Sequence, residues 1–407
     1  MQPTYSAEAE AYREKVQAFL AEHLPATWAG IGALPDEAAI TAFYASWRPL
    51  LAEQGYLAAS WPREYGGGGL SALETVILAE EFQRAGAPTG GPNDTFSIKM
   101  VGNTILAVGT DEQKAYFLPR IIDGTDVWCQ GYSEPDAGSD LGGLGCRAVL
   151  DGDEWVINGQ KIWTSAGQSA NWIFVLCRTD PDAPKHRGIS FLLCPMDQPG
   201  VEVRPIQMLT GASEFNETFF TDAKTPVGNV IGGVNNGWMV AMTLLGYERG
   251  EAAATMPVMF RAEYDKLVEL ARERGVTDDP TIRQRLAQMY AEVEVMRLLG
   301  MRTLTGFIKG RQPGPGESAF KLYWSEYHRR VTELAVDILG PEAMVITGTM
   351  PRTSFHADLP GAENSSASWV GTFMNARAGT IYAGTSQVQR NILGEMVLGL
   401  PKEPRPA

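Results

Sequence analysis

The spacing of apolar residues changes twice along the chain, and this limits the folds that the sequence can adopt. Up to about residue 125, and again after Trp238, apolar side chains recur at steps of three and four, as helices with one buried face require. From about residue 127 to 235, short alternating runs are separated by Asp-Gly and Asn-Gly, which is typical of strands joined by tight turns. The order is helices, sheet, helices. Without βαβ alternation or a GxGxxG motif after a strand, a Rossmann nicotinamide enzyme is disfavoured.

Local signals predict where several elements begin and end. Ser71 with Glu74 and Thr110 with Gln113 have the spacing of capping boxes, so each pair predicts a helix start. The glycines of WPREYGGGG, residues 61–69, predict a turn or a close backbone contact. The C-terminal part is predicted to contain three long helices, over 238–273, 281–309 and 317–339. In the second of them one apolar stripe is expected in the core, made of Ile282, Leu286, Met289, Val293 and Met296.

These patterns divide the chain into three domains and a tail. We expect an N-terminal helical domain, a middle β domain, a C-terminal helical domain and a polar, proline-rich tail, over 1–126, 127–236, 237–400 and 401–407. A chain of 407 residues with 44% hydrophobic and 20% charged residues is long enough for such cores.

Composition excludes several kinds of protein. A net charge of −14, without a basic stripe, argues against nucleic acid binding. The four cysteines lack CxxC spacing and lie in expected strands or at their edges, so we expect reduced core thiols. The four histidines have no ligand spacing, so no metal site is expected. The first residues contain no signal-like or membrane-spanning run, and we expect a cytoplasmic protein that is not in a membrane.

Two polar motifs in the β region carry candidate chemistry. QGYSEPDAGSDLGGL, residues 130–144, concentrates serines and glycines that could hydrogen-bond a flat polar ring or a phosphate. A hairpin loop capped by its own Ser and Asp side chains is the alternative for this motif alone. NGQKIWTSAGQSANW, residues 158–172, adds an indole and hydroxyls at a strand end, which favours a ligand site.

Together these two motifs resemble the flavin-contacting signature of the acyl-CoA dehydrogenase family. Further matching segments follow in the family's order: WPREYGGGG, GTDEQKAYFLPRI, PVGNVIGGVNNGW and IYAGTSQVQR, so the resemblance covers nearly the whole chain. It implies an α–β–α fold: an N-terminal helical domain, a central β-barrel domain and a C-terminal four-helix bundle. It also implies FAD as cofactor and α,β-dehydrogenation of an acyl-CoA thioester to a trans-2-enoyl-CoA.

The resemblance assigns roles to individual positions. Cofactor contacts are implied for Gln130, Tyr132, Ser133, Gly138, Ser139, Trp163, Ser165, Thr385 and Gln387. Contacts with the acyl-CoA are implied for Ser139, Arg249, Tyr382 and Ala383.

The catalytic base is not at its commonest position. Many members of the family carry a glutamate directly after the Ile-Tyr of the tail motif, where this chain has Ala383. A branch including isovaleryl-type enzymes carries it on the first C-terminal helix in a Leu-x-Glu-Arg context, and Glu248 in LLGYERGEAA fits that location. A water-poor pocket would let Glu248 accept the α-proton near neutral pH. Alternatively it is a surface glutamate paired with Arg249, or Glu251 is the base. The resemblance favours Glu248, and Ala383 keeps the backbone N–H that the family aims at the thioester carbonyl.

Two elements that grip the cofactor across the family's dimer interface are altered. LARERGVTDDP, residues 270–280, lacks the Phe-Gly of the family's Arg-x-x-Phe-Gly, leaving Arg272 or Arg274 as substitutes. AVDILGPEA places Asp337 at the glutamine position and Pro341 at a glycine of the second element, and a carboxylate there would repel a pyrophosphate. These alterations are compatible with a homo-oligomer and with an α2β2 heteromer that contains a related subunit. The resemblance implies the heteromer for actinobacterial enzymes acting on steroid side-chain thioesters.

Three functions remain as hypotheses. The first is an FAD-dependent acyl-CoA dehydrogenase of fatty acid or steroid side-chain metabolism that passes electrons to an electron-transfer flavoprotein. The second is a non-catalytic or half-site subunit of a heteromeric acyl-CoA dehydrogenase. The third is a flavin oxidase or monooxygenase on the same fold.

Overall fold

The described chain forms two compact units in a computed structural model. The description covers residues 6–309, 314–348, 350, 361 and 363–402, without the side chains of residues 247–252, 254 and 307. One unit, called the helical unit, is built from the described residues up to 43, from 70–89 and from 249 onward. The other, called the sheet unit, is built from 44–69 and 90–248. The three-domain division stays a prediction. Of the predicted tail, only residues 401 and 402 are described.

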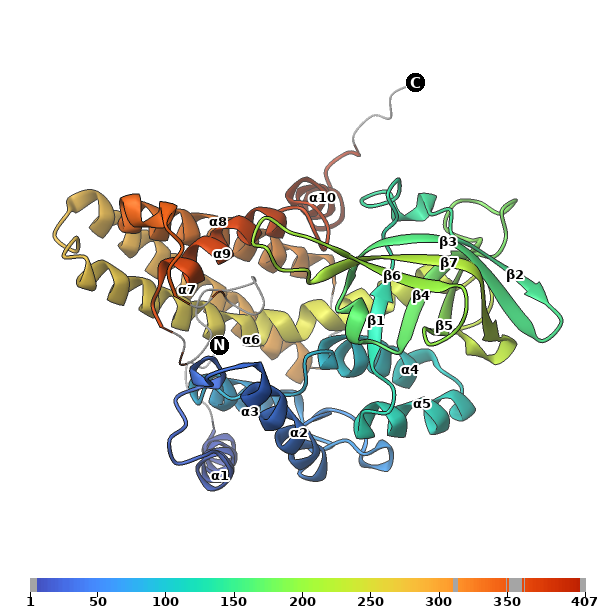
Figure 1. Ribbon diagram of the computed structural model, residues 1–407, viewed down its shortest axis with the longest axis horizontal. Helices are drawn as coiled ribbons and strands as arrows, with labels where there is room; N and C mark the ends of the chain where they lie inside the picture. Colours follow the sequence, from blue (N-terminus) through green and yellow to red (C-terminus); the bar gives the residue numbers. More distant parts are fainter. Residues whose placement is uncertain (1–5, 310–313, 349, 351–360, 362, 403–407) are drawn as a thin grey trace. The chain divides into compact units, whose positions relative to one another are not determined.

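The sheet unit contains one mixed eight-stranded sheet, drawn in green tones in Figure 1, in the order β6-β7-β3-β2-β4-β5-β8, with β1 paired to β4. Its strands are β1 (Trp128–Gly131), β2 (Arg147–Asp151), β3 (Glu154–Ser165), β4 (Trp172–Arg178), β5 (Ile189–Pro195), β6 (Val201–Ile206), β7 (Phe215–Pro226) and β8 (Val230–Ile231). Its helices include α4 (Asn103–Val108) and α5 (Asp111–Asp123). β1 and β2 pair with β4 in parallel, whereas the other ladders are antiparallel. The predicted strand region is confirmed.

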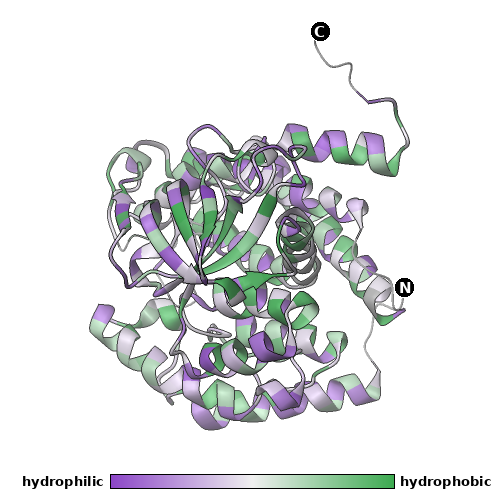
Figure 2. Cartoon of the chain, turned by 90° about the vertical axis from the view of Figure 1, so that its right-hand side faces the viewer, coloured by the Kyte–Doolittle hydropathy of each residue, from purple (hydrophilic) through white to green (hydrophobic). Residues whose placement is uncertain are grey.

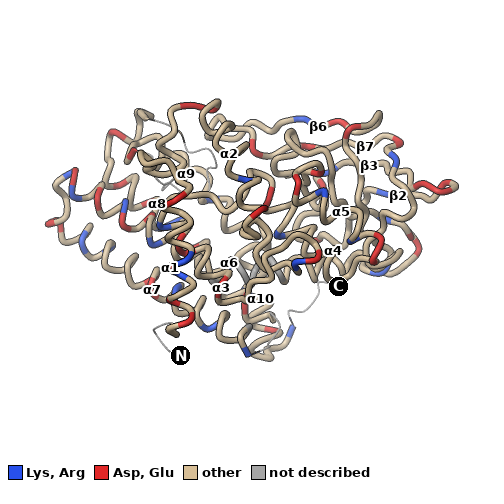
Figure 3. The backbone as a smooth tube through the Cα atoms, turned by 90° about the horizontal axis from the view of Figure 1, so that it is seen from below, with Lys and Arg blue, Asp and Glu red and all other residues tan. Residues whose placement is uncertain are grey.

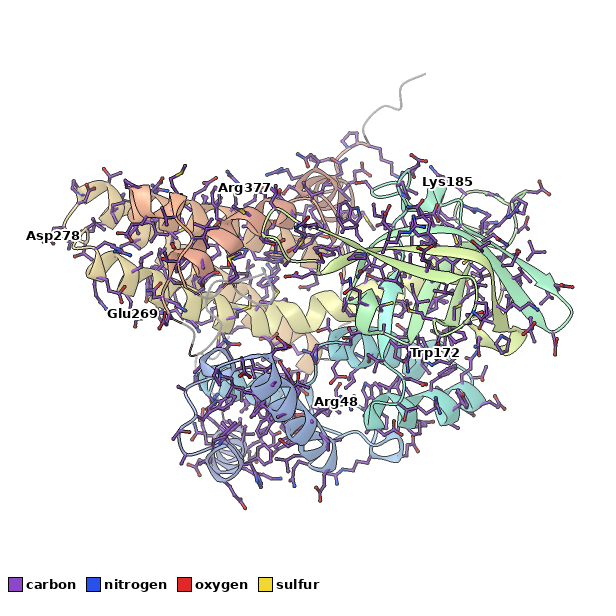
Figure 4. All side chains as sticks on the ribbon, viewed as in Figure 1. Arg48, Trp172, Lys185, Glu269, Asp278 and Arg377 are labelled. Atoms are coloured by element: carbon purple, nitrogen blue, oxygen red, sulfur yellow. The ribbon has the colours of Figure 1, made fainter. Side chains whose placement is uncertain are left out.

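Aromatic side chains fix the first strand against its neighbours. Phe117 of α5, Trp128 of β1 and Trp172 of β4 lie edge to face or tilted, with ring centroids 5.2 to 5.7 Å apart. Trp172, labelled in Figure 4, begins β4. This cluster holds β1 at the point where the first polar motif leaves the sheet.

The helical unit is built from long helices. They are α1 (Ala7–His23), α3 (Ala72–Arg84), α7 (Pro280–Ile308), α8 (Ser318–Leu339), α9 (Ser366–Gly379) and α10 (Ser386–Ile392), together with parts of α2 (Glu37–Glu53) and α6 (Gly237–Glu273) that continue into the other unit. The three predicted C-terminal helices are confirmed to within a residue at each end. Asp278 lies in the turn between α6 and α7 (Figure 4).

The bundle core is formed by apolar faces of α6, α7, α8 and α9. Four residues of the predicted stripe, Leu286, Met289, Val293 and Met296, are buried, and Ile282 packs against them. Phe260 of α6, Tyr327 of α8 and Trp369 of α9 complete this core. The remaining faces are mixed, since α7 also exposes Tyr290, Val295 and Leu298. Figure 2 shows hydrophobic and hydrophilic stretches along the helices, and Figure 3 shows acidic and basic residues interspersed along α7 and α8.

The predicted turns and caps are confirmed. Both capping boxes form. The hydroxyl of Ser71 accepts from the backbone N–H of Glu74, and the Glu74 side chain accepts from the backbone N–H of Ser71. Thr110 and Gln113 form the same pair of bonds. In WPREYGGGG a short 3₁₀ turn, Arg63–Tyr65, precedes the glycines. A Cβ on Gly67 would lie 2.2 Å from the Trp61 carbonyl oxygen, so the close backbone contact requires glycine there.

The four cysteines are free thiols and buried, as predicted. Within the described residues, no group of acidic, histidine or cysteine side chains has the arrangement of a metal site. No helix of the described chain combines the length and apolar character needed to cross a membrane.

Candidate active site

The two polar motifs of the sheet unit are joined to each other. The loop after β1 contains Tyr132 and Ser133, and the carbonyl of Ser133 accepts from the N–H of Ile162 in β3 at 2.9 Å. Lys161 in the same strand is fully buried, and its Nζ donates to the Tyr132 carbonyl at 3.1 Å. The strand that carries the second motif therefore holds the loop of the first.

Glu134 is the centre of this attachment. Its Oε1 accepts from Lys161 Nζ at 2.6 Å and from the N–H of Cys146 at 2.9 Å, while Oε2 accepts from the N–H of Gly145 at 2.6 Å. Further along the loop, Asp140 forms an ion pair with Lys185, which is labelled in Figure 4. The Glu134 carboxylate, whose side chain is 11% exposed, accepts from one ammonium and two backbone donors, so these contacts shape the loop.

Trp163 is displaced from the regular sheet by an irregularity in β3. The register between β3 and β7 shifts between Lys161 and Thr164, and Trp163 adopts φ 63°. Its indole is 56% exposed and contacts Phe215 edge to face at 6.1 Å. A left-handed tryptophan costs about 1–2 kcal/mol, and such strain gathers at ligand sites, so this exposed ring is a candidate contact surface.

Several polar side chains of the two motifs have no hydrogen-bond partner among the described residues. The side chains of Gln130, Ser133, Ser139 and Ser165 make no hydrogen bond to another described residue, and Gly138 has open space where a Cβ would stand. Hydroxyls and an amide can offer both donors and acceptors, and an exposed indole can offer a face, to a flat heteroaromatic ring. This donor set fits the isoalloxazine of a flavin. The predicted residues of the sheet unit lie on β1, its following loop and the end of β3.

The tail motif forms a tight turn in the helical unit. Ala383 has φ 52° and Gly384 has φ 86°, so two successive residues are left-handed. Thr385 then caps α10, its hydroxyl accepting from the N–H of Val388 at 3.1 Å. Tyr382 packs near Trp324 with ring centroids 6.4 Å apart, and the exposed Gln387 makes no side-chain hydrogen bond to a described residue.

The Ala383 N–H is a donor without a partner among the described residues. The N–H groups on either side of this turn are used, because Tyr382 donates to the Ala378 carbonyl at 3.0 Å and Ser386 donates to the Thr380 carbonyl at 2.9 Å. An exposed and oriented N–H of this kind suits a carbonyl oxygen that gains negative charge.

The predicted base and its neighbours lie outside the described side chains. Residues 248, 249 and 251 belong to α6, which continues without a break from Gly237 to Glu273. The side chains of Glu248, Arg249 and Glu251 are not among those described. The sheet-unit residues and the tail turn are therefore two separate parts of the predicted site, described each in its own unit.

A large cavity of the helical unit is not part of the predicted site. It has a volume of about 860 Å³ and is lined from α1, α3, α6 and α7, by residues that include Arg13, Glu80, Arg261 and Arg297. None of the predicted site residues lines it. Arg13 pairs with Glu80, and both Arg261 and Arg297 pair with Glu294, so these guanidinium groups are already engaged.

Sequence reasoning missed three residues that support the site. Glu134 and Lys161 lie inside the two quoted motifs, and Lys161 has a detectable signal because a lysine at an inward strand position needs a partner. Gln389 lies inside the tail motif and bonds back to the turn at Ala383. Nothing in the residue pattern alone indicates the role of Gln389.

The described chain has N-terminal helices, a mixed sheet and C-terminal helices, in that order along the sequence. Three domain models of the acyl-CoA dehydrogenase family match the chain: the N-terminal domain over 6–125, the middle domain over 129–223 and the C-terminal domain over 235–398. The chain therefore belongs to the acyl-CoA dehydrogenase family. It is an FAD-dependent oxidoreductase, since the members of this family are flavoproteins.

Known relatives and solved structures agree with this assignment. The chain is 42% identical to acyl-CoA dehydrogenase IpdE1 of Mycobacterium tuberculosis over 399 residues, which cover 97% of this chain and 99% of the relative. It superposes on the Tcur3481-Tcur3483 steroid ACAD with a TM-score of 0.81 and 34% identity, covering 99% of this chain and 100% of the other. The ChsE4-ChsE5 complex from Mycobacterium tuberculosis gives a TM-score of 0.78 and 32% identity, with coverage of 99% and 100%. The predicted fold class is confirmed.

Proposed function

We propose that this enzyme converts an acyl-CoA thioester to the trans-2-enoyl-CoA, with Glu248 removing the α-proton. The proton passes to the Glu248 carboxylate, and the negative charge that develops on the thioester oxygen is stabilised by the Ala383 N–H. Bound FAD supplies the acceptor for the hydride that leaves the β-carbon. One donor to such an oxyanion is worth roughly 2.7–4 kcal/mol of barrier height.

The observation that carries this proposal is the tail turn itself. The methyl group of Ala383 cannot accept a proton, yet its N–H, in a left-handed turn, has no partner within the part of the chain that the structure describes. Proton removal and enolate stabilisation are then performed by different segments. α6 runs unbroken through residue 248, which allows it to present a glutamate followed by an arginine from a rigid element.

The cofactor is assigned to this chain's own polar groups. We assign the isoalloxazine to Gln130, Tyr132, Ser133, Gly138, Ser139, Trp163 and Ser165, with Thr385 and Gln387 from the tail. The support is chemical: the unengaged side chains of Gln130, Ser133, Ser139, Ser165 and Gln387, together with an exposed indole, match the donors, acceptors and face of that ring.

The test of the base compares Glu248→Gln with Glu251→Gln. Removing a general base costs about 10²–10⁴-fold in rate, so Glu248→Gln is expected to lose kcat by that factor while its flavin spectrum stays unchanged. Glu251→Gln, three residues along the same helix, serves as the matched control and is expected to keep wild-type turnover. A Glu248→Gln enzyme with full turnover would refute the assignment, and a loss confined to Glu251→Gln would move the base there.

We further propose an α2β2 heteromer with a related subunit. Two of the positions expected to grip a neighbour's cofactor are engaged within the chain: Arg274 forms two bonds to Glu342, at 2.9 and 2.7 Å, and Asp337 pairs with Arg285 at 2.6 Å. Two relatives of solved structure are complexes named for two subunits, one of them a steroid ACAD.

The test is co-expression with a related subunit from the same genome, followed by native mass and flavin content. We expect a tetramer with both chains and more FAD per chain than in the isolated protein. A stable homotetramer with one FAD per chain would overturn the heteromer.

A bulky steroid side-chain thioester is the proposed substrate class, and an electron-transfer flavoprotein is the proposed acceptor. Rapid reoxidation of the reduced enzyme in air would instead favour an oxidase, in which oxygen takes the place of the electron-transfer flavoprotein as acceptor.

A further inference from the structure

The side chain of Gln389 binds directly to the tail turn. It is fully buried, and its Nε2 donates to the carbonyl oxygen of Ala383 at 3.0 Å and lies 3.4 Å from that of Gly384. The backbone N–H of Gln389 donates to the Thr385 carbonyl at 2.9 Å in the first turn of α10. The helix therefore fixes the carboxamide, and the carboxamide fixes two successive peptide groups.

This carboxamide is packed closely against the turn. A Cβ on Gly384 would lie 2.5 Å from Gln389 Nε2, so the glycine leaves room for the contact. Oε1 of Gln389 is buried and has no hydrogen-bond partner among the described residues. The amide orientation is set by the two carbonyl acceptors, because the opposite orientation would bring Oε1 against carbonyl oxygens.

Ala383 needs such a contact to keep its conformation. An alanine with φ 52° is disfavoured by its own Cβ, and an unrestrained chain would return to the right-handed or extended regions. Such a return would turn the Ala383 N–H to a different direction. With its carbonyl oxygen held by Gln389, the alanine stays left-handed and its N–H direction is fixed.

We infer that Gln389 is a positioning residue for the reaction: it holds Ala383 left-handed so that its N–H stays directed for the thioester carbonyl of the substrate. This inference rests on the proposed function, in which that N–H stabilises the enolate. Gln389 itself takes no proton and touches no reacting atom. Its contribution appears only when charge develops on the substrate oxygen, so it acts on kcat and on enolate binding more than on ground-state affinity.

The test is Gln389→Met, which keeps the length of the side chain and removes the donor. Because one oxyanion donor is worth about 10²–10³-fold in kcat, a partly misdirected N–H is expected to lower kcat at least about 10-fold with little change in KM. A 3-oxoacyl-CoA is acidic enough to bind as an enolate, and Gln389→Met is expected to bind it more weakly than the wild type by a similar factor. The S-alkyl-CoA thioether of the same chain length has no carbonyl and is expected to bind as in the wild type.

Two further measurements separate positioning from a general packing role. Hydrogen exchange of the peptide covering 381–392 in the apoprotein is expected to rise in Gln389→Met. Ala383→Gly is expected to reduce the effect of Gln389→Met in a double variant, because glycine adopts positive φ without strain. Ser386→Ala is the matched control, since it removes the bond from the same helix to Glu326 at 2.9 Å without touching the turn.

Equal kcat and equal 3-oxoacyl-CoA affinity in Gln389→Met and wild type would overturn the inference. A drop of the same size in Ser386→Ala would also overturn it, by showing that only the anchoring of α10 matters. If Gln389→Met does not fold, Gln389→Leu gives the same comparison with the donor removed. A wild-type holoenzyme that no acyl-CoA reduces would instead refute the proposed function, so the two failures are distinguishable.

Discussion

Replacing Lys161 by methionine removes one ammonium group from the core of the sheet unit and keeps most of the apolar length of the side chain. Lys161 is fully buried, and its Nζ lies 2.6 Å from Oε1 of Glu134 and 3.1 Å from the Tyr132 carbonyl oxygen. The substitution leaves Glu134 without its counter-charge. The loop after β1 then loses two of the contacts that join it to β3.

The expected cost follows from these contacts. Breaking a buried ion pair by removing one partner costs about 3–5 kcal/mol. Glu134 keeps two backbone donors, the N–H groups of Gly145 and Cys146, so we expect a value near the lower end, about 3 kcal/mol. For a unit of roughly 200 residues, that corresponds to a fall in Tm of about 6–12 °C.

The assay is urea unfolding of the apoprotein, followed by FAD titration of the folded variants. Glu134→Gln removes the orphaned charge, so the double variant Lys161→Met/Glu134→Gln is expected to be less destabilised than the sum of the two single variants. FAD affinity is expected to fall in Lys161→Met because the loop bearing Ser133 is less well held. An unchanged midpoint in Lys161→Met, or strict additivity in the double variant, would refute the coupling of this pair.

Other parts of the chain give shorter tests. Trp163→Gly is expected to weaken FAD binding while costing the apoprotein little stability, because glycine relieves the left-handed strain; a large loss of apoprotein stability in urea would contradict this. The hydrogen bonds from Ser71 hold the pKa of Glu74 below its usual value, so the capping box stabilises the fold above the unfolded-state pKa of Glu74 and this contribution is lost as pH falls through its lower folded-state pKa. Ser71→Ala is therefore expected to lower the free energy of unfolding by about 0.5–1 kcal/mol at neutral pH and by less in acid. Burial raises the pKa of the Cys194 thiol to about 12 and also raises the pKa of the Cys129 thiol. Iodoacetamide is therefore expected to label neither thiol until the protein unfolds, and rapid labelling of Cys129 or Cys194 in the native enzyme would count against their burial.

The sequence by itself determined the order and the ends of most elements. The capping boxes at Ser71 and Thr110 and the apolar stripe from Ile282 to Met296 depend on residues three or four apart. The glycines after Tyr65 depend on the conformations that the local backbone allows. Such interactions are present in the sequence at fixed spacing, so they predict structure before any fold is known. The family motifs added the cofactor and the reaction.

The tertiary structure decided which side chains hold the site. Lys161 and Glu134 are 27 residues apart, and only the path of β3 beside the loop after β1 makes them a pair. The position of Ala383 in the sequence says which residue replaces the missing carboxylate, but its left-handed conformation depends on the contact with Gln389. The Lys161–Glu134 pair needs packing between segments, because a buried polar group persists only where distant neighbours compensate for it. The Gln389 contact spans only six residues, and it depends on the turn and α10 bringing the carboxamide to the Ala383 carbonyl oxygen.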